Sequence, residues 1–119
     1  MKMNERLILL LENYNLSMNE ITRIVAMHFR LEINQIKSDS RDGKIVKSRD
    51  FCIYFLHKYL SNKIALESTK HRLIALYLLR DRLTIRHHQI KISWLIKKDK
   101  EYKKEYNILI NKLIQNDIF

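Results

Sequence analysis

The sequence predicts an all-α protein, a compact bundle of about six helices that contains a helix-turn-helix. Its 119 residues suit one hydrophobic core, and an apolar content of 46% is ordinary for a globular chain. The absence of proline and a single glycine leave few interruptions for strands and tight turns. Abundant Leu, Ile, Lys and Glu favour long helices. The longest apolar runs are far shorter than the roughly 20 residues that cross a bilayer, so we expect no membrane span.

The first 16 residues are expected to form an N-terminal helical arm, separate from a domain that covers residues 17–119. The arm is rich in leucine and ends in a short polar group of Asn and Ser. Ser17 and Glu20 have the spacing of a capping box, which predicts that a new helix begins here. One face of that helix carries Ile21, Ile24, Val25, His28 and Phe29.

The middle of the chain is predicted to hold a short helical turn over residues 33–36, a loop over residues 38–44, and then the central helix. From Ser48 onward, apolar residues recur at helical spacing, at Cys52, Phe55, Leu56, Tyr59 and Leu60. The lone cysteine lies on this stripe, so it is expected in the core, and it has no partner for an internal disulfide.

The last part of the chain is predicted to form three helices after a connector over residues 61–68. The first is a supporting helix that starts with Leu73, Leu76 and Tyr77. Asp81 is expected to cap the next helix, because its carboxylate can accept backbone amides. This helix turns Ile85, His88, Ile92 and Leu95 inward. A final amphipathic helix follows from residue 102, with Tyr106, Leu109, Ile110 and Leu113 on one face.

An abrupt polar and basic helix start follows the apolar run 73–79, and it indicates a DNA-binding element. Residues 80–88 read Arg-Asp-Arg-Leu-Thr-Ile-Arg-His-His. A helix-turn-helix needs this order, because the supporting helix is buried and the next helix offers its first side chains to the major groove. Arg82, Arg86 and Gln89 are expected on the exposed side, where they can contact base edges or phosphates.

The charge of the chain favours nucleic acid as a partner. The formal net charge is +10, and residues 63–104 hold twelve Lys or Arg against four acidic residues, which leaves +8 in this part alone. Such a cluster gains from the release of condensed cations when it neutralises phosphates. Binding is therefore expected to weaken steeply with salt.

Part of the chain resembles the C-terminal DNA-binding domain of the bacterial replication initiator DnaA, whose signature runs roughly G-G-R-D-H-T-T-V-x-H-A before a long helix. The residues that fit are Arg80, Asp81, Thr84, Ile85 and His87; those that depart from it are Leu78, Leu79, Arg82 and Leu83. Upstream, residues 21–29 and 33–37 resemble the family's first two helices. The resemblance spans residues 17–113 and does not include the ATPase module, since no phosphate-binding G-x-x-x-x-G-K-[ST] occurs.

The resemblance implies double-stranded DNA as the partner and suggests how the chain holds it. Arg82, Thr84 and Arg86 would enter a major groove, and His87 would bind a phosphate. Residues 47–49 fall where the family carries a basic R-P-R step, which implies backbone contact there, and Arg41 would reach a minor groove. The expected contact set is Arg41, Lys47, Arg49, Arg80, Arg82, Thr84, Arg86, His87 and Lys91.

Other classes of site find little support in the sequence. The acidic residues are scattered among lysines and no nucleophile has a paired base, so we expect no enzyme, no cofactor and no small-molecule substrate. His28, His57, His71 and Cys52 lack the paired spacing of a zinc site, so no metal is expected. A single cysteine and the absence of an apolar signal core favour the cytoplasm.

Three functions are weighed for this pattern. The leading one is a stand-alone DNA-binding protein that regulates replication or transcription without melting DNA. The second is a protein-interaction module that kept the fold and lost specific reading, and that binds a partner or itself through residues 7–11 and the basic surface. The third is nonspecific binding of single strands or RNA. Trp94, Leu83 and most tyrosines are expected in the packing, which argues against stacking on bases.

Overall fold

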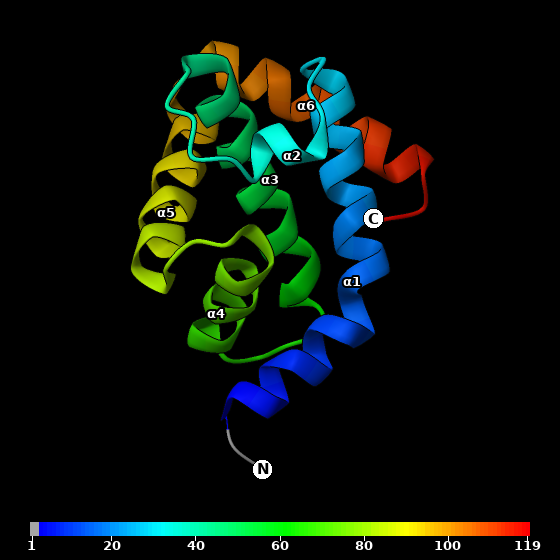
Figure 1. Ribbon diagram of the computed structural model, residues 1–119. Coiled ribbons are helices and arrows are strands. Elements are labelled where there is room, and N and C mark those ends of the chain that lie inside the picture. The colour runs from blue at the N-terminus through cyan, green and yellow to red at the C-terminus, as the bar shows by residue number, and fades with distance from the viewer. Residues whose placement is uncertain (1–2) are drawn as a thin grey trace.

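The computed structural model describes residues 3–119, and within that range it contains six helices and no strand (Figure 1). This confirms the predicted all-α bundle. The helices are α1 (Met3–His28), α2 (Ile33–Ile36), α3 (Gly43–Ser61), α4 (Glu67–Leu78), α5 (Arg82–Lys98) and α6 (Lys100–Gln115). No helix in the described range is long and apolar enough to cross a membrane.

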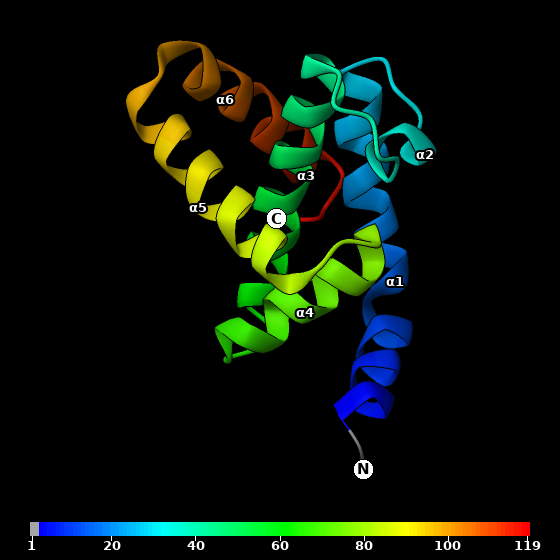
Figure 2. The same ribbon diagram turned by 60° about the vertical axis from the view of Figure 1, so that its left-hand side comes forward.

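The first helix is continuous over 26 residues, so the predicted helix start at Ser17 is wrong. No glycine or proline lies between residues 3 and 28, and the polar residues there fit within a helix without ending it. The N-terminal turns of α1 extend beyond α4 in both views (Figure 1, Figure 2). The division of the chain at residue 16 stays a prediction, and residues 1 and 2 of the arm lie outside the described range.

The core is built around α3, which packs against α1, α2, α4 and α5. Phe51 and Phe55 are fully buried on this helix, and their rings stack against Tyr102 and Tyr106 of α6. Cys52 is buried as predicted, and burial raises the pKa of its thiol to about 12. The thiol is therefore a packing group rather than a nucleophile at neutral pH.

The turn between α4 and α5 sets the angle of the two helices (Figure 2). Helix α4 begins at Glu67, a turn and a half before the predicted apolar start, and ends at Leu78. Leu79 then takes the left-handed conformation, with φ 58° and ψ 45°, and the Arg80 amide donates to the Ala75 carbonyl at 2.9 Å. Glycine adopts this conformation freely, whereas leucine pays about 1–2 kcal/mol. The resembled signature carries glycine at this position.

Candidate nucleic-acid interface

The start of α5 is fixed by the side chain of Asp81, as predicted. One carboxylate oxygen accepts the Thr84 backbone amide at 2.8 Å, and the other accepts the Thr84 hydroxyl at 2.7 Å. These bonds hold the pKa of Asp81 below its ordinary value of 3.8, because they stabilise the charged form. The Thr84 side chain is thus part of the cap, while its oxygen still has room to accept a bond.

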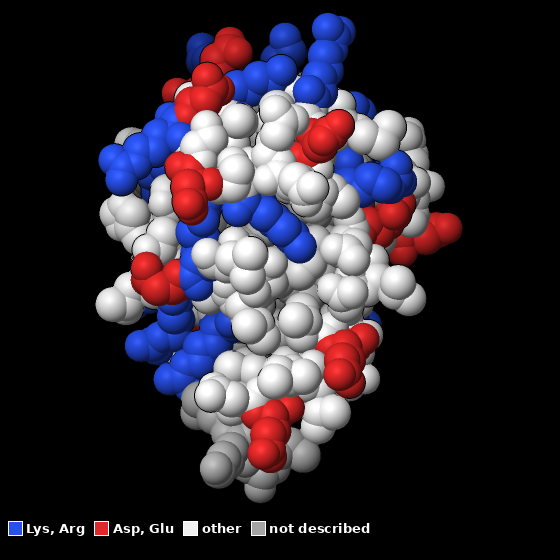
Figure 3. All heavy atoms as spheres, viewed as in Figure 1, with Lys and Arg blue, Asp and Glu red and all other residues white. Residues whose placement is uncertain are grey.

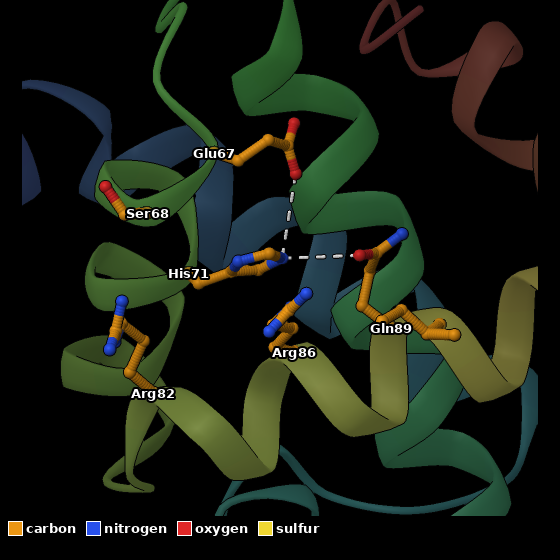
Figure 4. Close-up of a pocket in the computed structure, with 7 residues that line it drawn as sticks. Glu67, Ser68, His71, Arg82, Arg86 and Gln89 are labelled. Atoms are coloured by element: carbon orange, nitrogen blue, oxygen red, sulfur yellow. Dashed lines mark hydrogen bonds and ion pairs between the residues drawn. The ribbon is translucent and has the colours of Figure 1, made fainter.

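Three of the predicted contact residues lie together on the outer side of α5. Arg82, Arg86 and His87 are exposed on the first turns of the helix. Neither arginine has an acidic partner within residues 3–119. Arg86, Arg82 and Gln89 also line a pocket between α4 and α5 (Figure 4).

Gln89 does not stand free as expected, because it takes part in the contact between the two helices. It is half-buried, and its side-chain oxygen lies 3.2 Å from His71 Nε2 of α4 (Figure 4). Its amide nitrogen donates to Ser93 Oγ at 3.2 Å. Gln89 therefore holds α4 against α5.

The outer side of α5 also carries apolar side chains, of which Leu83 and Trp94 were expected in the packing. Leu83, Ile90 and Trp94 are 65%, 55% and 61% exposed. The prediction is wrong for Leu83 and Trp94 because the inner face of α5 is already occupied by Ile85, Ile92 and Ile96, which are buried. Positions 83, 90 and 94 fall on one side of a helix, so these residues form an exposed apolar stripe.

Arg49 is not available to a DNA backbone in this structure, which corrects the expectation from the basic R-P-R step. The residue is 7% exposed and points into the fold. Its guanidinium donates to the carbonyl oxygens of Ile36 and Ser38, each at 2.7 Å, and to that of Ser40 at 3.2 Å. Arg49 thereby holds the loop over residues 37–42 against α3.

Arg80 holds the same loop from the other side, so it too is occupied. Its guanidinium forms an ion pair with Asp39 at 3.1 Å and donates to the Ser38 carbonyl. The side chain is largely covered. Arg80 thus ties the turn between α4 and α5 to the loop before α3. Contrary to the prediction, its guanidinium group is not freely exposed to solvent.

Two further predicted cations lie beside acidic groups. Lys91 Nζ is 2.7 Å from Asp50 Oδ2, and the other oxygen of this buried carboxylate is 2.6 Å from His88 Nδ1. Lys47 Nζ is 3.9 Å from Glu105 Oε1 and 4.9 Å from the centre of the Tyr102 ring. Both lysines remain partly exposed.

Sequence reasoning did not find Asp50, because a single acid within an apolar helix gives no local signal for the two cations it will face. Arg41 is exposed in the loop over residues 37–42, at the edge of a second pocket that Thr84 and His88 also line. This pocket joins the loop to the first turns of α5. The structure therefore brings Arg41 near the helix-turn-helix, as the resemblance implied.

The surface charge gathers on the side of α4 and α5. Figure 3 shows Lys and Arg side chains along the left-hand edge of the view, where these helices lie in Figure 1, with single acidic side chains between them, and further Lys and Arg side chains along the top edge. Uncharged side chains cover most of the centre of the same face. A polyanion is attracted to such an edge, because opposite charges lower its energy there.

Comparison with known proteins supports the resemblance that the sequence suggested. The model of the bacterial DnaA protein helix-turn-helix family matches residues 18–68, which run from the middle of α1 to the start of α4. The chromosomal replication initiator protein DnaA of Mycoplasma capricolum subsp. capricolum is 27% identical over 99 residues. That match covers 83% of this chain and 21% of the relative. The chain therefore spans about a fifth of the length of the curated relative that it matches.

The two matches differ in what they cover. The family model stops before the turn and α5, so Arg82, Arg86 and their neighbours lie outside its matched residues. No solved structure matches the chain. The roles of the α5 side chains therefore rest on their geometry and on the signature at residues 80–87.

Proposed function

We propose that this chain, which is similar to the bacterial DnaA helix-turn-helix family, binds double-stranded DNA with the first turns of α5 in a major groove. One observation carries the proposal. Arg82 and Arg86 stand exposed, without an acidic partner in the described range, at the positive end of a helix that follows a buried supporting helix. Arginine in this position can contact guanine edges or phosphates. His87 would contact a phosphate beside them, and the Thr84 oxygen, whose hydrogen Asp81 accepts, would accept a bond from a base amino group.

A second set of contacts flanks α5. Arg41 and Lys47 would hold the backbone on the side of the loop over residues 37–42, while Arg49 and Arg80 keep that loop in shape. Lys91 would strengthen the positive field, since its ammonium already faces Asp50. On this proposal Arg49 and Arg80 position the loop, and the exposed arginines bind DNA.

We infer that such binding serves to occupy DNA sites and to regulate replication or transcription. The proposal concerns DNA binding alone, because the residues that support it form a DNA-binding surface. The target sequence is left to experiment, because Arg82 and Leu83 replace the histidine and the first threonine of the resembled signature. Selection of bound sequences from random duplexes identifies it.

The proposal is tested with the double variant Arg82→Ala/Arg86→Ala in a duplex-binding titration at several salt concentrations. Affinity at low salt should fall about 10- to 100-fold, and the slope of log K against log salt should lose about 2, one for each lost phosphate contact. Circular dichroism and thermal unfolding should be unchanged, because both side chains are exposed.

The matched control is Lys97→Ala/Lys98→Ala, which removes the same charge from the last turn of α5. Its affinity should change less than about threefold. Equal losses in both double variants would point to charge alone and contradict a reading role for α5. Equal affinity for unpaired strands would favour the third function, nonspecific single-strand or RNA binding.

A second candidate function, a protein-interaction module, is favoured by the apolar stripe of Leu83, Ile90 and Trp94. Exposed apolar groups on one helix face are common at protein interfaces. The outer turns of α1 add Ile8 and Leu9, which are half exposed. Self-association through either surface is measured by sedimentation of the wild type, Ile90→Ser/Trp94→Ser and Ile8→Ser/Leu9→Ser.

The outcomes separate the two surfaces. A dimer that only the α5 variant dissociates would place the interface on the apolar stripe and compete with DNA binding. A dimer that only the α1 variant dissociates would leave α5 free for DNA. If the protein is a monomer at every concentration, self-association is excluded, and the second candidate function would then require a separate protein partner.

A further inference from the structure

Two histidines and a glutamate lie close together beside the helix-turn-helix. His57 lies in the last turns of α3, Glu67 is the first residue of α4, and His71 lies one turn later. Glu67 Oε2 is 2.9 Å from His57 Nε2 and 3.8 Å from His71 Nε2. One ligand atom from each residue lies within 4.8 Å of the other two.

We propose that His57, Glu67 and His71 bind a divalent transition-metal ion, with Zn²⁺ as the best-matched ion. Imidazole nitrogens and one carboxylate form a ligand set that zinc accepts, with a fourth position left for water. Donor atoms around tetrahedral zinc lie about 3.3 Å apart, as bond lengths of about 2.0–2.1 Å require. The observed 2.9 Å and 3.8 Å fall on either side of that separation.

The two imidazoles are already arranged for shared coordination. Their rings stack with centres 5.4 Å apart and planes 19° apart, and both Nε2 atoms turn toward the same carboxylate oxygen. His71 is buried, and its Nε2 lies within 4.8 Å of the other two ligand atoms. His57 and His71 therefore need little rearrangement to bind one ion.

The neighbours of the site supply its surroundings. Gln89 Oε1 lies 3.2 Å from His71 Nε2, so it can take the fourth position when Nε2 binds the ion (Figure 4). Lys70 Nζ lies 2.5 Å from the other glutamate oxygen, Oε1, and leaves Oε2 to the histidines.

A bound ion would join the end of α3 to the first turn of α4, across the connector that leads into the helix-turn-helix. It would also add positive charge to the pocket that Arg82 and Arg86 line. The inference is independent of the proposed DNA binding, because the metal is measured without DNA.

The experiment is a titration of untagged, metal-free protein with Zn²⁺ by isothermal calorimetry and thermal unfolding, and with Co²⁺ by visible absorption. We expect one ion per chain, a rise of the unfolding temperature with ion concentration, and the d–d bands of tetrahedral Co²⁺. Glu67→Gln and His57→Gln should weaken binding at least about tenfold, as loss of one ligand does.

Two controls keep the result specific. Glu67 is exposed and His57 lies at a helix end, so both variants should keep the helical circular dichroism of the wild type. His87→Gln removes an exposed imidazole outside the cluster and should leave binding unchanged. Equal affinity in wild type, Glu67→Gln and His57→Gln, or no saturable binding in the wild type, would overturn the proposal.

Discussion

Four arginines near the turn between α4 and α5 fall into two groups with opposite surroundings, although they are the same residue type in neighbouring parts of the fold. On the loop side, Arg49 and Arg80 have their guanidinium groups satisfied by carbonyl oxygens and Asp39. On the outer side of α5, Arg82 and Arg86 are exposed and have no acidic partner in the described range. Arg49 and Arg80 hold the loop in place, and Arg82 and Arg86 extend into solvent from the helix beside it.

The difference teaches that net charge overstates the number of cations available to a partner. Lys91 and Lys47 also face acidic groups, so the basic surface is partly committed to internal pairs. Buried guanidinium groups carry a desolvation cost that only good acceptors offset, which explains their tight bonding. The following variants test this contrast between anchoring and displayed cations.

The largest effect is expected for Arg49→Ala. Its removal leaves the carbonyl oxygens of Ile36 and Ser40 without their charged donor and the Ser38 carbonyl with Arg80 alone, so the free energy of unfolding should fall by about 3 kcal/mol. Urea denaturation measures the change. The exposed Arg41→Ala in the same loop is the control and should stay within about 0.5 kcal/mol of the wild type. Similar stability in both variants would show that the loop does not depend on Arg49.

A smaller effect is expected for Asp50→Asn, which removes the ion pair of Lys91 and leaves its ammonium group free. The neutral side chain no longer pairs with Lys91, so stability should fall by about 1–2 kcal/mol. Duplex affinity at low salt should rise, because the surface gains one net positive charge. A fall in affinity would instead mean that the contact from Asp50 to His88 and Lys91 sets the position of α5.

The smallest effect on stability is expected at the N-terminal cap of α5, the helix that carries Arg82 and Arg86. Asp81→Asn keeps an acceptor oxygen but loses the charge, so the wild type should unfold at a slightly higher temperature near pH 7. Because the folded-state pKa of Asp81 is lowered, this advantage is complete above pH 3.8 and is lost as the pH falls through the lower folded value. Asp117→Asn, outside this cap, is the control. A constant difference across that range would contradict the charge-based explanation.

Local patterns predicted much of the fold. The apolar stripe placed Cys52 in the core, and the position of Asp81 after an apolar run predicted its cap. The continuous α1 was missed because a capping-box spacing also occurs inside helices, where no backbone amide needs it. The fold class followed from composition, and the resemblance to the DnaA domain followed from a few residues of one signature.

The site was predicted less completely, for a physical reason. The exposure of Arg82 and Arg86 follows from their place on one helix, which is local information. The roles of Arg49 and Arg80 depend on carbonyl oxygens that only the folded loop brings near. Trp94 was expected inside because periodicity alone does not tell how much of an apolar helix the core can cover.

The left-handed Leu79 makes the pair of helices dependent on the rest of the molecule. A strained residue holds its shape only where surrounding contacts compensate, and here these include the bond from Arg80 to the loop that Arg49 also grips. A peptide of α4 and α5 alone would lose that support and relax toward a different crossing. The α4–α5 pair therefore cannot be moved into another protein by itself, because the transferred segment would need the loop over residues 37–42 and α3 as well.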